Sequence, residues 1–278
     1  MPNSAPPLTV TLLGTGTSTG VPVLGCDCAV CTSDDPRDQR LRTSAHVVAH
    51  TEAGDVHLQI DAGPDFRRQA LRDSVTEVDA LLVTHEHFDH VAGLDDLRPL
   101  FFRNRAPIPV YARAGTADAL HAMFRYVFDR TYPGASLLDL HRVDGPFVVT
   151  SRSAPEAAVE VVPIVAPHGP SEVLGFRLGA FAYLTDVSAV SDDVADRLGG
   201  VETLVLDGLR PDPHPTHLSF DEAAEAAARI GARETWLIHV THAVRHTEAE
   251  RGLPEGVRLG YDGLVLTVPG GGPTLEGA

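Results

Sequence analysis

Hydrophobic and polar positions along the chain predict two groups of strands, each interrupted by helices. Apolar or alternating runs predict strands at residues 8–13, 45–50, 56–60, 79–84, 146–149, 158–165, 173–178, 181–185, 202–207, 235–240, 257–259 and 263–268. Helical spacing predicts helices at residues 64–72, 115–128, 191–198 and 219–230. Because strands and helices are mixed in both halves and no linker or repeat separates them, the pattern favours one domain of two β-sheets with helices outside.

Local signals support several of these boundaries. Ser219 with Glu222 three residues later forms a capping box at the start of the helix 219–230. Residues 14–44 are polar and contain every cysteine, so we predict a long loop there, and loops of this length are usually functional. We therefore expect a single domain over residues 1–270 with a Cys-rich loop at 14–44, and a loose Gly/Pro-rich tail over residues 271–278.

Composition narrows the class of protein. Of 278 residues 43% are apolar, which suits a packed globular chain, and no apolar run has the roughly 18 residues that a membrane span needs. The first residues lack the features of a secretory signal, so we expect a cytoplasmic protein without a membrane partner. The net charge of −16 disfavours extended nucleic acid, although a small anionic substrate could still reach a site that holds cations. A homodimer is the commonest assembly for such an enzyme.

The strongest chemical signal follows the strand at residues 79–84. Residues 84–90 read Thr-His-Glu-His-Phe-Asp-His, and alternate positions of an extended chain point the same way. We expect His85, His87 and Asp89 to share one face and His90 to turn in as a helix begins. Four ligand-type side chains within six residues can serve two metal ions, and this nitrogen and oxygen set admits manganese, zinc or iron.

A second signal lies in the Cys-rich loop. Cys26, Cys28 and Cys31 offer three thiolates within six positions, which favours a structural zinc ion rather than a disulfide framework. Such a site needs a fourth ligand. The alternative is three free thiols on a loop.

The run His-x-His-x-Asp-His after a strand resembles the signature of the metallo-β-lactamase superfamily, and residues 60–63, Ile-Asp-Ala-Gly, look like its first motif. The resemblance implies an α/β (α+β) fold, a four-layer αββα sandwich. It also implies three later ligands, each after a strand, at His168, Asp186 and His239. One metal would be held by His85, His87 and His168, the other by Asp89, His90 and His239. Asp186 would bridge the two metals, and Asp61 would orient a ligand by a hydrogen bond.

Within this superfamily the cysteine cluster and the opening at residues 14–22 are similar to the cyclic phosphodiesterases of bacterial phosphonate breakdown. That likeness places the fourth zinc ligand three residues after the last active-site histidine, at His242. His246 and His46 are the rival candidates.

The likeness also implies a reaction. Phosphodiesterases of this superfamily place a proton-donating histidine ahead of a helix, and His217 matches that position, with His214 as runner-up. We predict hydrolysis of a small cyclic phosphodiester, such as phosphoribosyl 1,2-cyclic phosphate or a 2′,3′-cyclic nucleotide. A metal-bridging hydroxide would attack, with His217 as general acid and with Asp89 and Asp207 as further catalytic residues.

Three alternatives remain open from the sequence. A tRNA 3′-end processing endonuclease would share the ligands, but the 17 residues between His168 and Asp186 leave no room there for its usual tRNA-binding arm. An iron-dependent oxygenase of the same fold would use a different metal and substrate. A non-catalytic, zinc-stabilised binding protein would not need the full second set of metal ligands.

Overall fold

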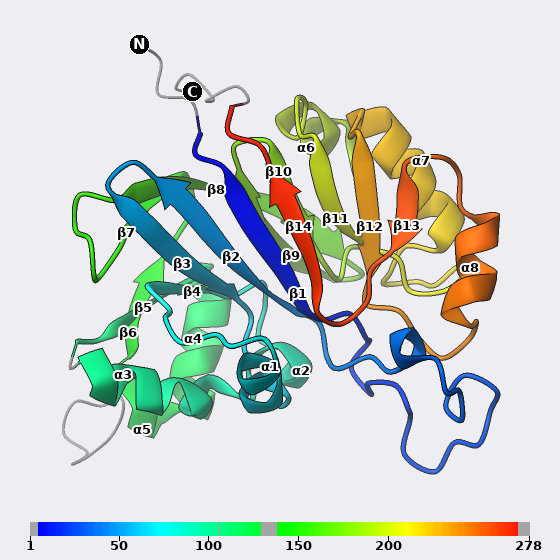
Figure 1. Ribbon diagram of the computed structural model, residues 1–278, viewed down its shortest axis with the longest axis horizontal. Coiled ribbons are helices and arrows are strands. Elements are labelled where there is room, and N and C mark those ends of the chain that lie inside the picture. The colour runs from blue at the N-terminus through cyan, green and yellow to red at the C-terminus, as the bar shows by residue number, and fades with distance from the viewer. Residues whose placement is uncertain (1–4, 105, 129–137, 272–278) are drawn as a thin grey trace.

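Two facing β-sheets form the centre of the protein in the computed structural model, which describes residues 5–104, 106–128 and 138–271 (Figure 1). Within these residues each sheet has seven strands, in the order β14-β1-β2-β3-β4-β5-β6 and β13-β12-β11-β10-β9-β8-β7. The first sheet comprises β1 (Leu8–Gly14), β2 (Ser44–Thr51), β3 (Gly54–Ile60), β4 (Ala80–Leu82), β5 (Ile108–Ala112), β6 (Leu138–Arg142) and β14 (Leu264–Val268). The second comprises β7 (Phe147–Thr150), β8 (Ala158–His168), β9 (Ser171–Leu178), β10 (Phe181–Leu184), β11 (Thr203–Asp207), β12 (Glu234–Ile238) and β13 (Val257–Leu259).

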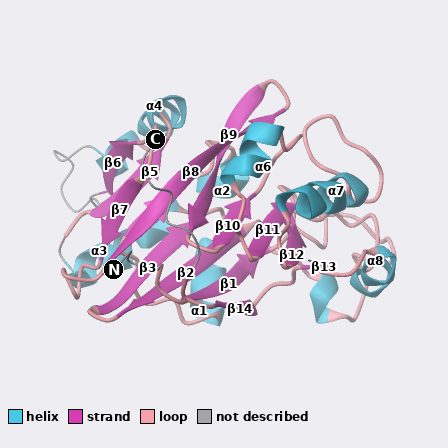
Figure 2. Ribbon diagram, turned by 90° about the horizontal axis from the view of Figure 1, so that it is seen from above, coloured by secondary structure: helices cyan, strands magenta, loops and turns pink. Residues whose placement is uncertain are grey.

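Helices cover the outer face of each sheet (Figures 1 and 2). The first sheet carries α1 (Phe66–Arg72), α2 (Phe88–Val91), α3 (Arg98–Asn104), α4 (Ala114–Met123) and α5 (Arg125–Phe128). The second carries α6 (Asp192–Arg197), α7 (Phe220–Ile230) and α8 (His246–Gly252). Short 3-10 turns lie at Pro36–Asp38 and Leu94–Leu97. Among the described residues, no helix has the length and apolar character needed to cross a membrane.

Three apolar clusters hold these layers together. The central cluster fills the space between the sheets and includes Leu58, Phe176 and Tyr183, which are all fully buried. The other two clusters lie between each sheet and its own helices. Burial of a side chain of this size contributes about 1.5–3 kcal/mol. The stacking of helix, sheet, sheet and helix confirms the predicted four-layer αββα sandwich.

The apolar pattern located twelve of the strands described, but missed β5 and β6 and the helices α3 and α8. β5 contains Pro109, and β6 is a half-exposed edge strand with three polar residues, so neither gives a clear apolar run. The single helix predicted at 115–128 is wrong. It is broken at Phe124, whose φ of −119° and ψ of 37° are not helical.

The helix prediction at 219–230 is confirmed together with its capping box. The Ser219 side chain accepts from the Glu222 amide, and the Glu222 carboxylate accepts from the Ser219 amide at 2.8 Å. Residues 272–278 of the predicted tail lie outside the described part of the chain. The cap fixes where α7 begins, and therefore where the preceding loop with His217 must end.

Candidate active site

The predicted site residues follow the carboxyl ends of strands from both sheets. Asp61 follows β3, Asp186 lies two residues after β10, and His239 follows β12. Each has a positive φ, of 55°, 56° and 63°, and Ser74 is the one other non-glycine residue among those described with this conformation. Because such backbone is costly for L-residues, its concentration here indicates a site whose geometry the fold enforces.

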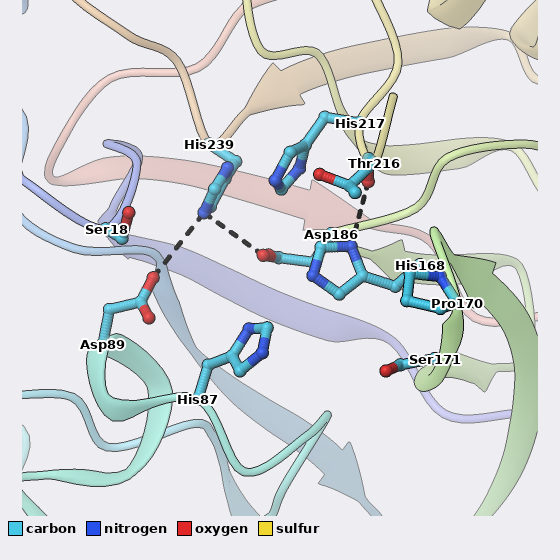
Figure 3. A pocket seen from close by; sticks show the side chains of 10 residues that line it. All are labelled: Ser18, His87, Asp89, His168, Pro170, Ser171, Asp186, Thr216, His217 and His239. Atoms are coloured by element: carbon cyan, nitrogen blue, oxygen red, sulfur yellow. Dashed lines mark hydrogen bonds and ion pairs between the residues drawn. The ribbon is translucent and has the colours of Figure 1, made fainter. Parts of the chain in front are cut away.

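A cavity of about 320 Å³ opens between these strand ends (Figure 3). It is lined by Ser18, His87, Asp89, His168, Pro170, Ser171, Asp186, Thr216, His217 and His239. The carboxylates and imidazoles lie in the middle of this wall. Ser18 stands on one side of them, and Pro170 and Ser171 stand on the other.

The seven residues predicted to bind metal form two adjoining groups. In each group the potential ligand atoms all lie within 4.8 Å of one another. The first group is His85, His87, His168 and Asp186, and the second is Asp89, His90 and His239. The Asp186 carboxylate faces both, since Oδ2 is 3.8 Å from His85 Nε2 and 3.4 Å from His239 Nε2. The structure therefore places these residues in the two groups that the resemblance implied. Metal binding itself stays a prediction.

Asp61 organises two of these histidines from behind. Its Oδ2 lies 2.7 Å from His90 Nδ1, and its two oxygens accept from the amide and hydroxyl of Thr84 at 2.9 and 2.8 Å. Because the hydroxyl proton of Thr84 goes to Asp61, Thr84 Oγ1 accepts from His85 Nδ1 at 3.0 Å. The Nδ1 atoms of both histidines are thus engaged by Asp61 and Thr84, which leaves Nε2 as the atom that faces the Asp186 carboxylate, at 3.8 Å for His85 and 3.3 Å for His90.

Several buried polar atoms in this site have no hydrogen-bond partner. Nε2 of His90 and Nε2 of His239 are buried without a hydrogen bond, and their nearest polar neighbours are carboxylate oxygens, Asp89 Oδ2 at 3.2 Å from His90 and Asp186 Oδ2 at 3.4 Å from His239. Burial acts to lower the pKa of His90, but Asp186 and Asp61 outweigh it and hold that pKa well above its usual range. The carboxylates thus favour positive charge at this point, and imidazole nitrogens that converge beside them fit divalent cations of the zinc, manganese or iron type.

His217 lies on the loop between β11 and α7, beside the metal-ligand groups. Its Nδ1 is 3.0 Å from Oδ2 of the fully buried Asp207, which also accepts from the amide of Val187. Burial first, and then the nearby His239, lower the pKa of His217 to about 4, while burial raises the pKa of Asp207 well above its usual range. His214, the rival donor, hydrogen-bonds to Thr216 and is not part of the cavity wall.

The Cys-rich loop forms a separate cluster. The sulfur atoms of Cys26, Cys28 and Cys31 each lie 3.4 Å from Nδ1 of His242. These four residues form one of the groups of the described chain that could hold a metal ion. The rivals lie elsewhere, since His46 bonds to Gln59 and His57 within the first sheet, and the amide of His246 bonds to Asp38.

Sequence reasoning missed the side walls of the cavity and one buried carboxylate. Ser18 and Ser171 line the cavity, and neither had been predicted as a site residue. Asp262 accepts hydrogen bonds from the amides of Thr15 and Leu41 at 2.9 and 2.8 Å. The carbonyl of Thr15 in turn accepts from the amide of Val240, next to His239. No local pattern could reveal these contacts because the partners are more than 200 residues apart.

Comparisons with known proteins agree with this arrangement. Residues 57–240 match the sequence model of the beta-lactamase superfamily domain. An octanoyltransferase of Porphyromonas gingivalis is 42% identical over 258 residues, or 91% of this chain, which spans only 50% of that protein. Coenzyme PQQ synthesis protein B of a Methylobacterium species is 27% identical over 309 residues, 92% of this chain and 99% of that protein. A solved diphosphatase from the PhnP family superposes with a TM-score of 0.83 at 40% identity, covering 94% of this chain and 97% of that one.

Proposed function

This chain belongs to the β-lactamase superfamily, and we propose that it is a metal-dependent phosphodiesterase that hydrolyses a small cyclic phosphodiester. The observation that carries the proposal is one cavity in which two metal-ligand groups meet at Asp186 while His217, backed by Asp207, forms part of the wall. The likeness to a diphosphatase at 40% identity supports a reaction at phosphorus.

The residues of this chain would have distinct roles in binding the metal ions and in orienting their ligands. The first group would hold one divalent cation and the second group another, with Asp186 shared between them. Two such ions, when bound, acidify water and neutralise the charge on a phosphoryl group. Asp61 and Thr84 keep Nε2 of His85 and of His90 facing Asp186, and burial keeps competing water from these ligands.

His217 would protonate the departing oxygen. The Nδ1 proton is held by Asp207, so Nε2 is the atom available to the substrate. Burial lowers the pKa of His217 to about 4, so the imidazolium would give up its Nε2 proton readily, while Asp207 keeps the Nδ1 proton in place. The ring centroid of His217 lies 4.7 Å from that of His239 and 5.0 Å from that of His168, and these contacts keep the imidazole beside the predicted metal ligands.

The proposal is tested by the variant His217→Ala with His214→Ala as its matched control. We expect His217→Ala to lower turnover of a cyclic ribose phosphodiester by about 10²–10⁴-fold and to keep the metal content of the wild type. His214→Ala should change turnover far less, because its ring is not on the cavity wall. Loss of metal from His217→Ala would make it a ligand instead, a role open to it because its ligand atom lies within 4.8 Å of those of Asp186 and His239.

A second, independent test of proton donation compares substrates with different leaving groups. An alkoxide must be protonated as it departs, whereas p-nitrophenolate leaves without help. The His217→Ala variant should therefore lose much less activity on bis(p-nitrophenyl) phosphate than on a cyclic ribose diester. Equal losses on both substrates would contradict proton donation by His217.

The second candidate is an oxygen-dependent iron enzyme of the same fold, because the nitrogen and oxygen ligands of the two groups also suit iron. Metal analysis of the purified protein and oxygen uptake with iron separate it from a hydrolase. A tRNA 3′-end endonuclease is less well supported, because β9 and β10 occupy most of the stretch between His168 and Asp186 where its binding arm would emerge.

A further inference from the structure

The part of the cavity wall that lies outside the proposed metal ligands is nearly uncharged. Five of the ten lining residues belong to this part, namely Ser18, Pro170, Ser171, Thr216 and His217. His217 is the proposed proton donor, and the other four are neutral. No arginine is among the ten lining residues described, and the chain of 278 residues contains no lysine at all. A second anionic group on a substrate would therefore meet no permanent cation on this wall.

The arginines on neighbouring segments are already engaged. Arg113 is paired with the carboxylate of Glu172, the residue after Ser171. Arg42, beside Gly20 in the loop that carries Ser18, lies 3.0 Å from Asp65 Oδ2. A phosphate would have to displace these carboxylates to recruit either guanidinium, and that exchange of one anion for another gains little.

Arg210 is the cation of the loop that carries His217, and it also turns back on its own segment. Its Nε donates to the carbonyl of Asp212 at 3.3 Å and its Nη2 to the carbonyl of Pro213 at 3.2 Å. The electrostatic field of the whole protein also disfavours a second anionic group on the substrate. A net charge of −16 repels additional negative charge, and a metal pair would offset this only locally.

The neutral wall is nevertheless able to hydrogen-bond. Ser18 and Ser171 stand on opposite sides of the ligand groups (Figure 3), and both are exposed. Within the described chain neither hydroxyl is engaged by another residue, so each can donate to and accept from a substrate hydroxyl. A sugar whose hydroxyls are free fits this wall better than one that carries a further phosphate.

We propose that the site selects phosphodiesters that carry a single phosphoryl group on an uncharged, hydroxyl-bearing remainder, and disfavours those that carry a second phosphate. The inference rests on the proposed function, since it concerns the substrate of that same site. It favours nucleoside 2′,3′-cyclic phosphates and unphosphorylated ribose cyclic phosphates over phosphoribosyl 1,2-cyclic phosphate.

The test uses two substrates that differ by one group, ribose 1,2-cyclic phosphate with and without its 5-phosphate. We expect kcat/KM for the phosphorylated substrate to be lower than for its partner. Equal values, or a preference for the phosphorylated substrate, would overturn the inference alone. If the protein hydrolyses neither of these substrates and leaves bis(p-nitrophenyl) phosphate intact as well, the proposed function is overturned and the inference with it.

A variant that adds a positive charge tests whether the charge on the cavity wall sets the substrate preference. Ser171→Arg places a cation on the wall, and the matched control Ser171→Gln adds similar length without charge. Only Ser171→Arg should raise the ratio of kcat/KM for the phosphorylated to the unphosphorylated substrate, by about tenfold for one charge-assisted contact. The gain should shrink as salt is added. An unchanged ratio in a folded Ser171→Arg protein would show that wall charge does not set the selection.

Discussion

Asp61 offers a demanding test of how the ligand groups are held, because it is fully buried and lies behind two of the predicted ligands. The substitution Asp61→Asn keeps the shape of the side chain and removes its charge. Asparagine also tolerates the positive φ of 55° at this position, so the backbone need not change. Any effect therefore reports on the hydrogen bonds.

The expected magnitude follows from the donors that converge on Asp61. The carboxylate accepts from Thr84 N at 2.9 Å, Thr84 Oγ1 at 2.8 Å and His90 Nδ1 at 2.7 Å. An amide has only one acceptor atom, so its NH₂ group must face at least one of these donors. A lost hydrogen bond to a charged group costs about 1.5–3 kcal/mol. We expect the metal-free protein to lose stability of this order, and the affinity of the dinuclear site to fall by about 10–100-fold.

The assay is a competition between the protein and a chelator for Mn²⁺, which the thiolate cluster does not favour, together with thermal unfolding of the metal-free form. Asp65→Asn is the control, since Asp65 is a nearby carboxylate that pairs with Arg42 and contacts no predicted ligand. Wild-type Mn²⁺ affinity in Asp61→Asn would refute the idea that this carboxylate orients His90 and, through Thr84, His85.

Three further predictions concern other parts of the site. Asp186→Ala removes the carboxylate shared by both ligand groups, so the protein should lose both dinuclear metals by elemental analysis, and full activity would contradict that scheme. Cys28→Ser should remove one zinc per chain and lower the melting temperature, and a chelator should then destabilise the variant less than the wild type. Burial raises the pKa of Asp262 from 3.8 to about 6, so the folded protein holds this proton more tightly than the unfolded chain. Its stabilising contribution is full below the unfolded pKa of 3.8 and is lost as pH rises through 6. A shift of this size amounts to about 3 kcal/mol in all, of which about 1.4 kcal/mol falls between pH 5 and 7.5, so over that interval urea unfolding should show Asp262→Asn gaining about 1.4 kcal/mol in free energy of unfolding relative to the wild type.

The sequence was most informative where chemistry and local structure coincide. Residues 84–90 place four ligand-type side chains directly after an apolar strand, and a single segment then defines much of both ligand groups. The fold was predictable in the same way, because the strands read either as apolar runs, such as β10 and β11, which are buried throughout, or as alternating runs, such as β14. β5 and β6 were missed. Pro109 interrupts the apolar pattern of β5, and β6 is partly exposed to solvent and contains several polar residues.

The rest of the site depends on contacts between distant segments. Ser18 and Ser171 reach the same cavity from loops more than 150 residues apart, and no periodicity reports that meeting. The role of Asp262 is hidden for the same reason. A buried carboxylate in a turn gives no signal in the sequence until the amides of Thr15 and Leu41 are seen to converge on it.

The loop at 14–44 then acquires a role beyond its predicted zinc site. His239 of the second ligand group and His242 of the cysteine cluster are three residues apart, so one short segment serves both. Its backbone is fixed at Val240 by Thr15 and at Thr241 by Arg40, whose side chain is fully buried and pairs with Asp38 at 3.3 Å. The loop therefore holds His239 by direct contact with its neighbours. Because His239 also has a positive φ, which the chain alone would not choose, these contacts supply the restraint that keeps it beside Asp186.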